Sequence, residues 1–275
     1  VASSNYAEDL RIDYSILDQH AESYRKIRNT FRYLLGNIND NFETINFDAL
    51  DVDGLPELEQ LMLHKIYILN DNFKKYFNNY DFHNLYKELL NFCTVDLSAF
   101  YFDIRKDNLY CDPKVSKKRK STILLLNIIL NTLLKWFAPI LSFTTEEIFK
   151  LLFKDQKSIH LEKFLDLPEK FKNQKLSEKW DELIKIRNIC NISIEEKRAS
   201  KEIGSSLEAD LKIQLNKKLK NLTENIDFSE LCITSRAEVI YKDDIETMAI
   251  TSKAKGSKCP VCWKINEMSC PRHPE

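Results

Sequence analysis

The end of the chain contains the side chains best suited to bind a metal ion. Cys259 and Cys262 are separated by two residues, and after seven further residues Cys270 and His273 repeat that spacing. Each such turn places two ligands on one side of a metal, and a short loop brings the second pair opposite. The alternative is a chance cluster in a polar tail. We predict a tetrahedral Zn²⁺ site whose four ligands all come from the protein, so that the metal is structural.

A second group of residues has the chemistry to bind phosphates. Five cations lie within seven residues, namely Lys114, Lys117, Lys118, Arg119 and Lys120. Clustered Lys and Arg displace counterions from a nucleic-acid backbone and give salt-sensitive affinity that depends little on sequence. A solvated basic surface is the alternative, and neither interpretation is favoured by the residues alone.

Three further candidates for nucleic-acid contact are less distinctive. Arg187, Arg198 and Lys201 belong to a long charged segment that also carries Glu195, Glu196 and Glu202, so a solvated helix is the favoured interpretation. Trp263 follows the first cysteine pair and could stack on an unpaired base. It could equally be the hydrophobic plug of the metal site, which is slightly favoured.

The composition excludes several kinds of active site. The four glycines of this 275-residue chain are too far apart for a dinucleotide or phosphate loop. The chain also lacks an HExxH pair and a nucleophile elbow. The net charge is −1, so nucleic-acid affinity must come from local patches. The four remaining cysteines are scattered singly, which is typical of reduced thiols and predicts a cytoplasmic protein. We expect no catalytic residue in this chain.

Hydrophobic periodicity predicts a mainly α fold. We expect helices over residues 15–35, ending at Gly36, and from Pro56 to residue 77. Further helices should follow Asp81 as an N-cap and begin near residues 112–113. A capping box formed by Thr144 and Glu147 should start another. The apolar run 121–143 carries a polar stripe and is interpreted as a core helix and not as a membrane span.

These elements predict four parts of the chain. Residues 1–153 should form a helical bundle, and the Lys-rich residues 154–176 a linker. Residues 177–255 should form a small α+β junction domain, with a helix over 177–200 and strands at 209–215 and within 227–241. Residues 256–275 should form the zinc knuckle.

Several segments resemble one family in order and spacing. They are residues 24–35, 80–83, 100–107, 136–144 and 201–209, which read YRKIRNTFRYLL, YDFH, FYFDIRKD, WFAPILSFT and KEIGSSLEA. Together with the terminal KCPVCW of residues 258–263, they resemble the anticodon-binding and zinc-binding parts of bacterial isoleucyl-tRNA synthetases, which are class I aminoacyl-tRNA synthetases. Valyl and leucyl enzymes share the bundle, but RKIRNT combined with the terminal cysteine motif points to the isoleucyl branch. The chain departs from many members in carrying His273 where they have a fourth cysteine.

The resemblance implies a division of labour. The parent enzyme would join isoleucine to its tRNA with ATP and Mg²⁺, but the HIGH and KMSKS sequences of its catalytic domain do not occur here, and neither does its editing domain. Val1 stands in mid-pattern, so we expect the chain to be part of a longer, monomeric polypeptide. The implied partners are isoleucine tRNA and the catalytic and editing domains of the same polypeptide. Two alternatives stay open, a free-standing tRNA-binding accessory module and a zinc-tailed helical scaffold without RNA affinity.

Overall fold

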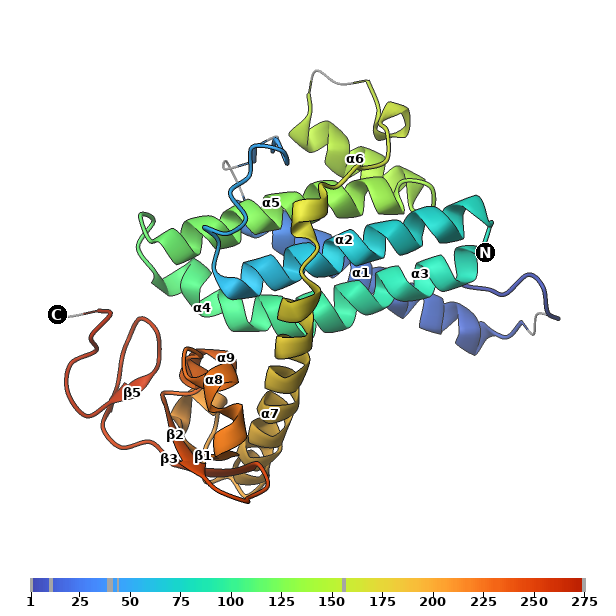
Figure 1. Ribbon diagram of the computed structural model, residues 1–275. Helices are drawn as coiled ribbons and strands as arrows, with labels where there is room; N and C mark the ends of the chain where they lie inside the picture. Colours follow the sequence, from blue (N-terminus) through green and yellow to red (C-terminus); the bar gives the residue numbers. More distant parts are fainter. Residues whose placement is uncertain (1, 10–11, 39–41, 44, 155–156, 274–275) are drawn as a thin grey trace. The chain divides into compact units, whose positions relative to one another are not determined.

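The computed structural model describes residues 2–9, 12–38, 42–43, 45–154 and 157–273. It is mainly helical, with small sheets and a Cys/His cluster near the C-terminus, as the sequence predicts (Figure 1). The chain forms two compact units. The first comprises Val1–Leu109 and Pro113–Asn173, and the second comprises Tyr110–Asp112 and Gln174–Glu275. The boundary after Asn173 falls inside the segment expected to be a linker.

The first unit is a bundle of long helices. Its elements are α1 (Tyr14–Ile38), α2 (Glu57–Asn78), α3 (Phe82–Asn91), the π-helix η2 (Phe92–Phe102), α4 (Asp103–Cys111), α5 (Lys117–Phe137) and α6 (Ser142–Leu152). Helix α5 contacts α1, α2 and α6, so it occupies the centre of the bundle. The apolar run of the sequence forms this helix and is buried along most of its length. Among the described residues, no helix is long and apolar enough to cross a membrane.

Two helix boundaries follow their local signals. Pro56 is the N-cap of α2, where its missing amide costs nothing. Asp81 caps α3 by accepting a hydrogen bond from the Asn84 amide at 3.2 Å, as predicted.

Three predicted boundaries are wrong, two because of tertiary packing and one because a different residue caps the helix. Helix α1 continues through Gly36 to Ile38, whose side chain is buried. Helix α6 begins at Ser142, before the predicted capping box, and the Thr144 hydroxyl pairs instead with the Tyr24 hydroxyl at 2.9 Å. Helix α5 begins at Lys117 and not near residue 112, with Ser116 as its N-cap.

A buried ion pair links three helices of the bundle. Arg105 of α4 donates to both carboxylate oxygens of Glu59 in α2, at 2.6 Å each. The Tyr101 hydroxyl of η2 also donates to Glu59, at 3.0 Å. Glu59 is fully buried and Arg105 is 3% exposed, so neither charge is solvated by water. Loss of either partner would leave the other charge buried without a counterion, which strongly destabilises a fold.

Residues 157–173 are held against the bundle. They contain the 3₁₀ turns η3 (Ile159–Leu161) and η4 (Glu169–Phe171). The buried Asn70 donates to the Leu165 carbonyl at 3.1 Å and accepts from the Trp136 indole at 3.0 Å. Phe171 is also buried. This segment is therefore irregular but packed.

The second unit places a small sheet against a long helix. Helix α7 (Gln174–Ala199) contacts β1 (Ala209–Asn216) and β3 (Met248–Lys253). Strand β1 lies in the middle of the sheet, parallel to β2 (Arg236–Lys242) and antiparallel to β3. The sequence predicts β1 and β2. It misses β3, in which only Thr251 is fully buried, so its hydrophobic pattern is weak.

The remaining elements of this unit are short. They are η5 (Ser206–Glu208), η6 (Lys217–Leu219), α8 (Lys220–Thr223), α9 (Phe228–Leu231) and the two-stranded hairpin β4 (Ser257–Lys258) and β5 (Ile265–Asn266). The Cys/His cluster is formed by this hairpin and the residues that follow it.

Candidate metal centre and nucleic-acid surface

The first two metal-ligand candidates, Cys259 and Cys262, lie on the β4–β5 hairpin, and Cys270 and His273 follow it. Gly256 has φ of 121°, and a Cβ atom there would lie 2.1 Å from the Asn266 carbonyl oxygen, so only glycine fits. Beyond it, the Cys259 amide donates to the Lys264 carbonyl at 2.9 Å, and the Trp263 amide donates to the Cys259 carbonyl at 3.0 Å. These bonds fold the Cys-x-x-Cys segment into a tight turn with both thiols on the same side.

The structure brings the four predicted ligands together. Their donor atoms all lie within 4.8 Å of one another. Sγ of Cys262 and Sγ of Cys270 are 3.8 Å apart, and Nδ1 of His273 lies 3.6 Å from Sγ of both Cys259 and Cys270. A tetrahedral ion with Zn–S bonds of ~2.3 Å and a Zn–N bond of ~2.0 Å places sulfurs ~3.8 Å apart and sulfur from nitrogen ~3.6 Å apart. The donor set therefore fits one metal ion with no open coordination position.

The surroundings lower the pKa of one thiol in the cluster and raise the pKa of another. A hydrogen bond from the Cys262 backbone is the main cause that lowers the pKa of Cys259, to about 6. Burial raises the pKa of Cys262 to about 12. A bound metal cation replaces these protons, because a coordinating thiol is deprotonated outright.

A contact that the sequence does not suggest orients the histidine. Nε2 of His273 lies 2.9 Å from the Cys111 carbonyl oxygen, so Nε2 carries the proton and Nδ1 presents its lone pair to the thiols. The same hydrogen bond raises the pKa of His273. Next to it, Arg272 forms an ion pair with Asp112 at 2.6 Å. Cys111 also packs against the three cysteine ligands. Residues 110–112 thus belong to the surroundings of the metal site.

Trp263 does not fill the knuckle's interior. Its ring is 59% exposed, and the Lys258 ammonium lies 5.2 Å from the ring centroid, within cation–π range. The interpretation of Trp263 as a hydrophobic plug is therefore wrong. Buried cysteines and Cys111 form that core instead. An exposed indole of this kind is available for stacking on a base.

The basic cluster lies at the start of α5 in the first unit. Lys114, Lys117 and Lys120 are exposed, and Lys118 and Arg119 are half-buried. Across the described residues, no carboxylate forms an ion pair with Lys114, Lys117 or Lys120. Cations in the first turn of a helix also oppose the helix dipole. The structure therefore leaves positive charge at this place without internal compensation.

The basic residues of the second unit have different surroundings. Arg198 forms an ion pair with Glu195 at 2.6 Å, and Arg187 donates to the Leu231 carbonyl at 2.9 Å. Arg198 and Lys201 border a shallow groove of about 450 Å³ near the end of α7. Arg187 thus has a structural bond, and Arg198 has its charge partly compensated.

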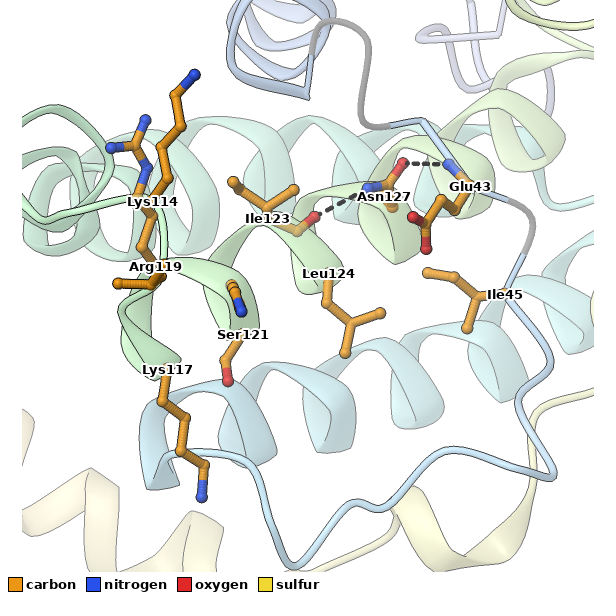
Figure 2. Close-up of a pocket in the computed structure, with 11 residues that line it drawn as sticks. Glu43, Ile45, Lys114, Lys117, Arg119, Ser121, Ile123, Leu124 and Asn127 are labelled. Carbon is orange, nitrogen blue, oxygen red and sulfur yellow. Dashed lines mark hydrogen bonds between the residues drawn. The ribbon is translucent and has the colours of Figure 1, made fainter.

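The basic cluster borders a larger groove in the first unit. This α5 groove has a volume of about 720 Å³ and lies between the start of α5 and the residues Glu43 and Ile45. Figure 2 shows Ile45 and Leu124 pointing toward a common space, with the Glu43 carboxylate beside them. Asn127 holds the two segments together, because it accepts from the Glu43 amide at 3.3 Å and donates to the Ile123 carbonyl at 3.1 Å. Sequence patterns gave no sign of this groove, which requires segments distant in the chain.

Comparison with known proteins identifies the family of this chain. The family model described as the anticodon-binding domain of tRNA ligase matches residues 59–228. This chain belongs to that family. The matched part of the anticodon-binding domain includes the whole basic cluster and the helices that position it, whereas the metal cluster lies beyond the matched residues.

Individual relatives extend the similarity over nearly the whole chain. The chain is 70% identical over 99% of its length to the isoleucine–tRNA ligase of Pelagibacter ubique strain HTCC1062. It is 37% identical over 97% of its length to the isoleucine–tRNA ligase of Bartonella henselae, and 36% identical over its full length to that of Agrobacterium fabrum. This anticodon-binding chain spans 28–30% of the length of those relatives.

Proposed function

We propose that this chain is the tRNA-binding portion of an isoleucine–tRNA ligase. The observation that carries the proposal is the 70% identity over 99% of the chain to a ligase of that name, within the anticodon-binding family. The bundle would hold the anticodon arm of isoleucine tRNA so that the acceptor end reaches a catalytic domain of the same polypeptide. ATP and Mg²⁺ would act in that domain. This portion would contribute binding energy and orientation to the reaction and no bond-making.

The ion that we propose for the Cys/His cluster is Zn²⁺ in a structural role. Three thiolates and one imidazole are the donors that zinc prefers, and the distances match its tetrahedral geometry. The metal would cross-link the hairpin and take no part in catalysis, because side chains would fill all four coordination positions. The residues of this chain then present the hairpin surface, including the exposed Trp263, to RNA.

The uncompensated lysines at the start of α5 would provide the main phosphate contact. A cation already paired to a carboxylate must give up that partner to bind phosphate, whereas Lys114, Lys117 and Lys120 form no ion pair with the carboxylates of the described chain. We therefore expect most of the salt dependence of tRNA binding to come from these three residues, and less from the cations of α7.

A salt series with matched variants tests this proposal. The variant K114Q/K117Q/K120Q removes three uncompensated charges, and K185Q/K197Q/R198Q removes three that are paired within the second unit. Each lost phosphate contact reduces the slope of log K against log salt by about 0.7 to 0.9. We expect the first variant to lower the slope for isoleucine tRNA by about two to three, and the control to lower it by less than one. Equal slopes for both variants and the wild type would contradict the assignment.

A further inference from the structure

The α5 groove combines features that a phosphate-binding surface alone does not need. Its volume of about 720 Å³ lies in the range of roughly 300–1,000 Å³ that is typical of small-molecule sites. The half-buried side chains of Ile45, Ile123 and Leu124 give it an apolar wall. A sugar–phosphate backbone gains little from apolar contact, whereas the flat face of a nucleobase gains stacking and burial.

Among the described residues, Glu43 is the only acidic one that lines this groove, which is also lined by Lys114, Lys117, Arg119 and Lys120. Its backbone amide is held by Asn127 at 3.3 Å, while its carboxylate bonds to no other described residue. A carboxylate beside a phosphate site weakens phosphate binding by repulsion. The same carboxylate favours binding of a ligand that has hydrogen-bond donors, because an ionised carboxylate can only accept.

We infer that the α5 groove binds one unstacked nucleotide of the RNA, whose base packs on Ile45 and Leu124 and donates to Glu43 while its phosphates contact the lysines. This inference rests on the proposed tRNA-binding function. Single-stranded RNA is commonly recognised by bases that are turned outward, stacked on side chains and bonded at their Watson–Crick edges. The lysines at the rim of the groove match the phosphates of such a nucleotide, and the Glu43 carboxylate matches the donors of its base.

The chemistry of the carboxylate also ranks the four bases. Guanine presents two adjacent donors, N1–H and the N2 amino group, which match the two oxygens of Glu43. Adenine and cytosine each present one amino donor beside an acceptor nitrogen. Uracil presents one N–H between two carbonyl oxygens that repel the carboxylate. The groove should therefore prefer guanine and reject uracil.

Binding of short RNAs to the full chain tests this ranking. The probes are fluorescent five-nucleotide oligouridylates whose central position is uridine, guanosine or inosine, measured by anisotropy. A bidentate contact to a base is worth about 1–3 kcal/mol of discrimination, so the guanosine probe should bind at least about fivefold more tightly than the uridine probe. Inosine lacks only the N2 amino group, and its affinity should lie between those two.

Variants of the chain assign the preference to the groove. Glu43→Gln should bring the guanosine-to-uridine affinity ratio close to one without weakening the uridine probe, because a repulsive charge is removed. Glu8→Gln makes the same change on an exposed residue that does not line the groove, and it should keep the wild-type ratio. Leu124→Ala should weaken the guanosine and inosine probes together, with the helical circular dichroism unchanged.

Two results would overturn the inference, and they have different consequences. Equal affinity for the three probes, or a guanosine preference that survives Glu43→Gln, would reject the nucleotide site. If isoleucine tRNA still bound in a salt-dependent way, the proposed function would stand and the α5 groove would act through its charge alone. No binding of either tRNA or the probes would reject both.

Discussion

His273 differs from the three cysteine ligands because it has a second ring nitrogen with a bond of its own. Nδ1 faces the thiols, and Nε2 donates to the Cys111 carbonyl at 2.9 Å. The ion pair of Arg272 with Asp112 holds the same segment, and the Asp112 side chain is only 14% exposed. A cysteine in place of His273 could bind the metal but could not reach Cys111. The histidine therefore joins the Cys/His cluster to residues 110–112 of the same unit.

We predict that Asp112→Asn weakens zinc binding. The substitution removes the charge that anchors Arg272, which leaves the neighbouring imidazole less well oriented. Partners in the second shell of a metal site contribute about 10- to 100-fold in metal affinity, and we expect a loss near the lower end, about tenfold. Competition with a chromophoric zinc chelator measures it.

The matched control for this substitution is Asp243→Asn. Asp243 also forms an ion pair at 2.6 Å, with Lys217, but that pair lies on the surface and away from the cluster. Its zinc affinity should equal that of the wild type. If Asp112→Asn also had the zinc affinity of the wild type, residues 110–112 would make no contribution to metal binding.

The grouping of Cys259, Cys262, Cys270 and His273 could be predicted from the sequence, but the residues that contact this group could not. The four ligands lie within fifteen consecutive residues, so their spacing alone indicates a shared metal. The bonds from Arg272 to Asp112 and from His273 to Cys111 span 160 and 162 residues. A lone cysteine and aspartate at such a distance carry no sequence signal, and only the fold brings them to the cluster.

Helices α2 and α4 are joined by the buried pair of Glu59 and Arg105. We predict that Arg105→Met destabilises the bundle by about 3–5 kcal/mol, because it leaves the Glu59 carboxylate buried without its counterion. The double variant with Glu59→Met as well should recover most of that loss, since an apolar pair needs no solvation. Urea unfolding followed by circular dichroism measures both.

An exposed ion pair provides the comparison for this prediction. Asp166 bonds to Lys74 at 2.7 Å with its side chain fully exposed, and Asp166→Asn should leave the urea midpoint unchanged. A midpoint for Arg105→Met equal to that of this control would mean that the buried pair contributes little to the bundle.

Element boundaries show where local signals suffice and where they fail. The start of α3 could be predicted from Asp81, because the side chain of this residue bonds directly to the Asn84 amide. Gly36 looks like a helix end, but nothing lies within 4 Å of a Cβ placed there, and the buried Leu34 and Ile38 extend α1 past it. Thr144 likewise has the spacing of a capping residue, but its hydroxyl bonds to the Tyr24 hydroxyl. Packing decided both cases.

At the scale of the whole molecule, the metal and the bundle belong to different compact units. All four ligands and residues 110–112 lie in the second unit. We predict that chelation lowers the thermal stability of the second unit and leaves the helical unfolding of the first unchanged. Zinc at 1,000 times its dissociation constant stabilises the unit that binds it by about 4 kcal/mol. Calorimetry with and without a chelator should show a shift of one transition. A shift of both transitions by the same amount would contradict this separation.

We propose that this chain holds isoleucine tRNA by its anticodon arm, and a single binding experiment can decide whether it does. The zinc-loaded chain is titrated with isoleucine tRNA and with the same tRNA carrying a replaced anticodon, at moderate salt. Because base contacts contribute about 1–3 kcal/mol each, the altered tRNA should bind at least about fivefold more weakly. Equal, salt-sensitive affinity for the two tRNAs would contradict anticodon recognition and leave only a basic surface.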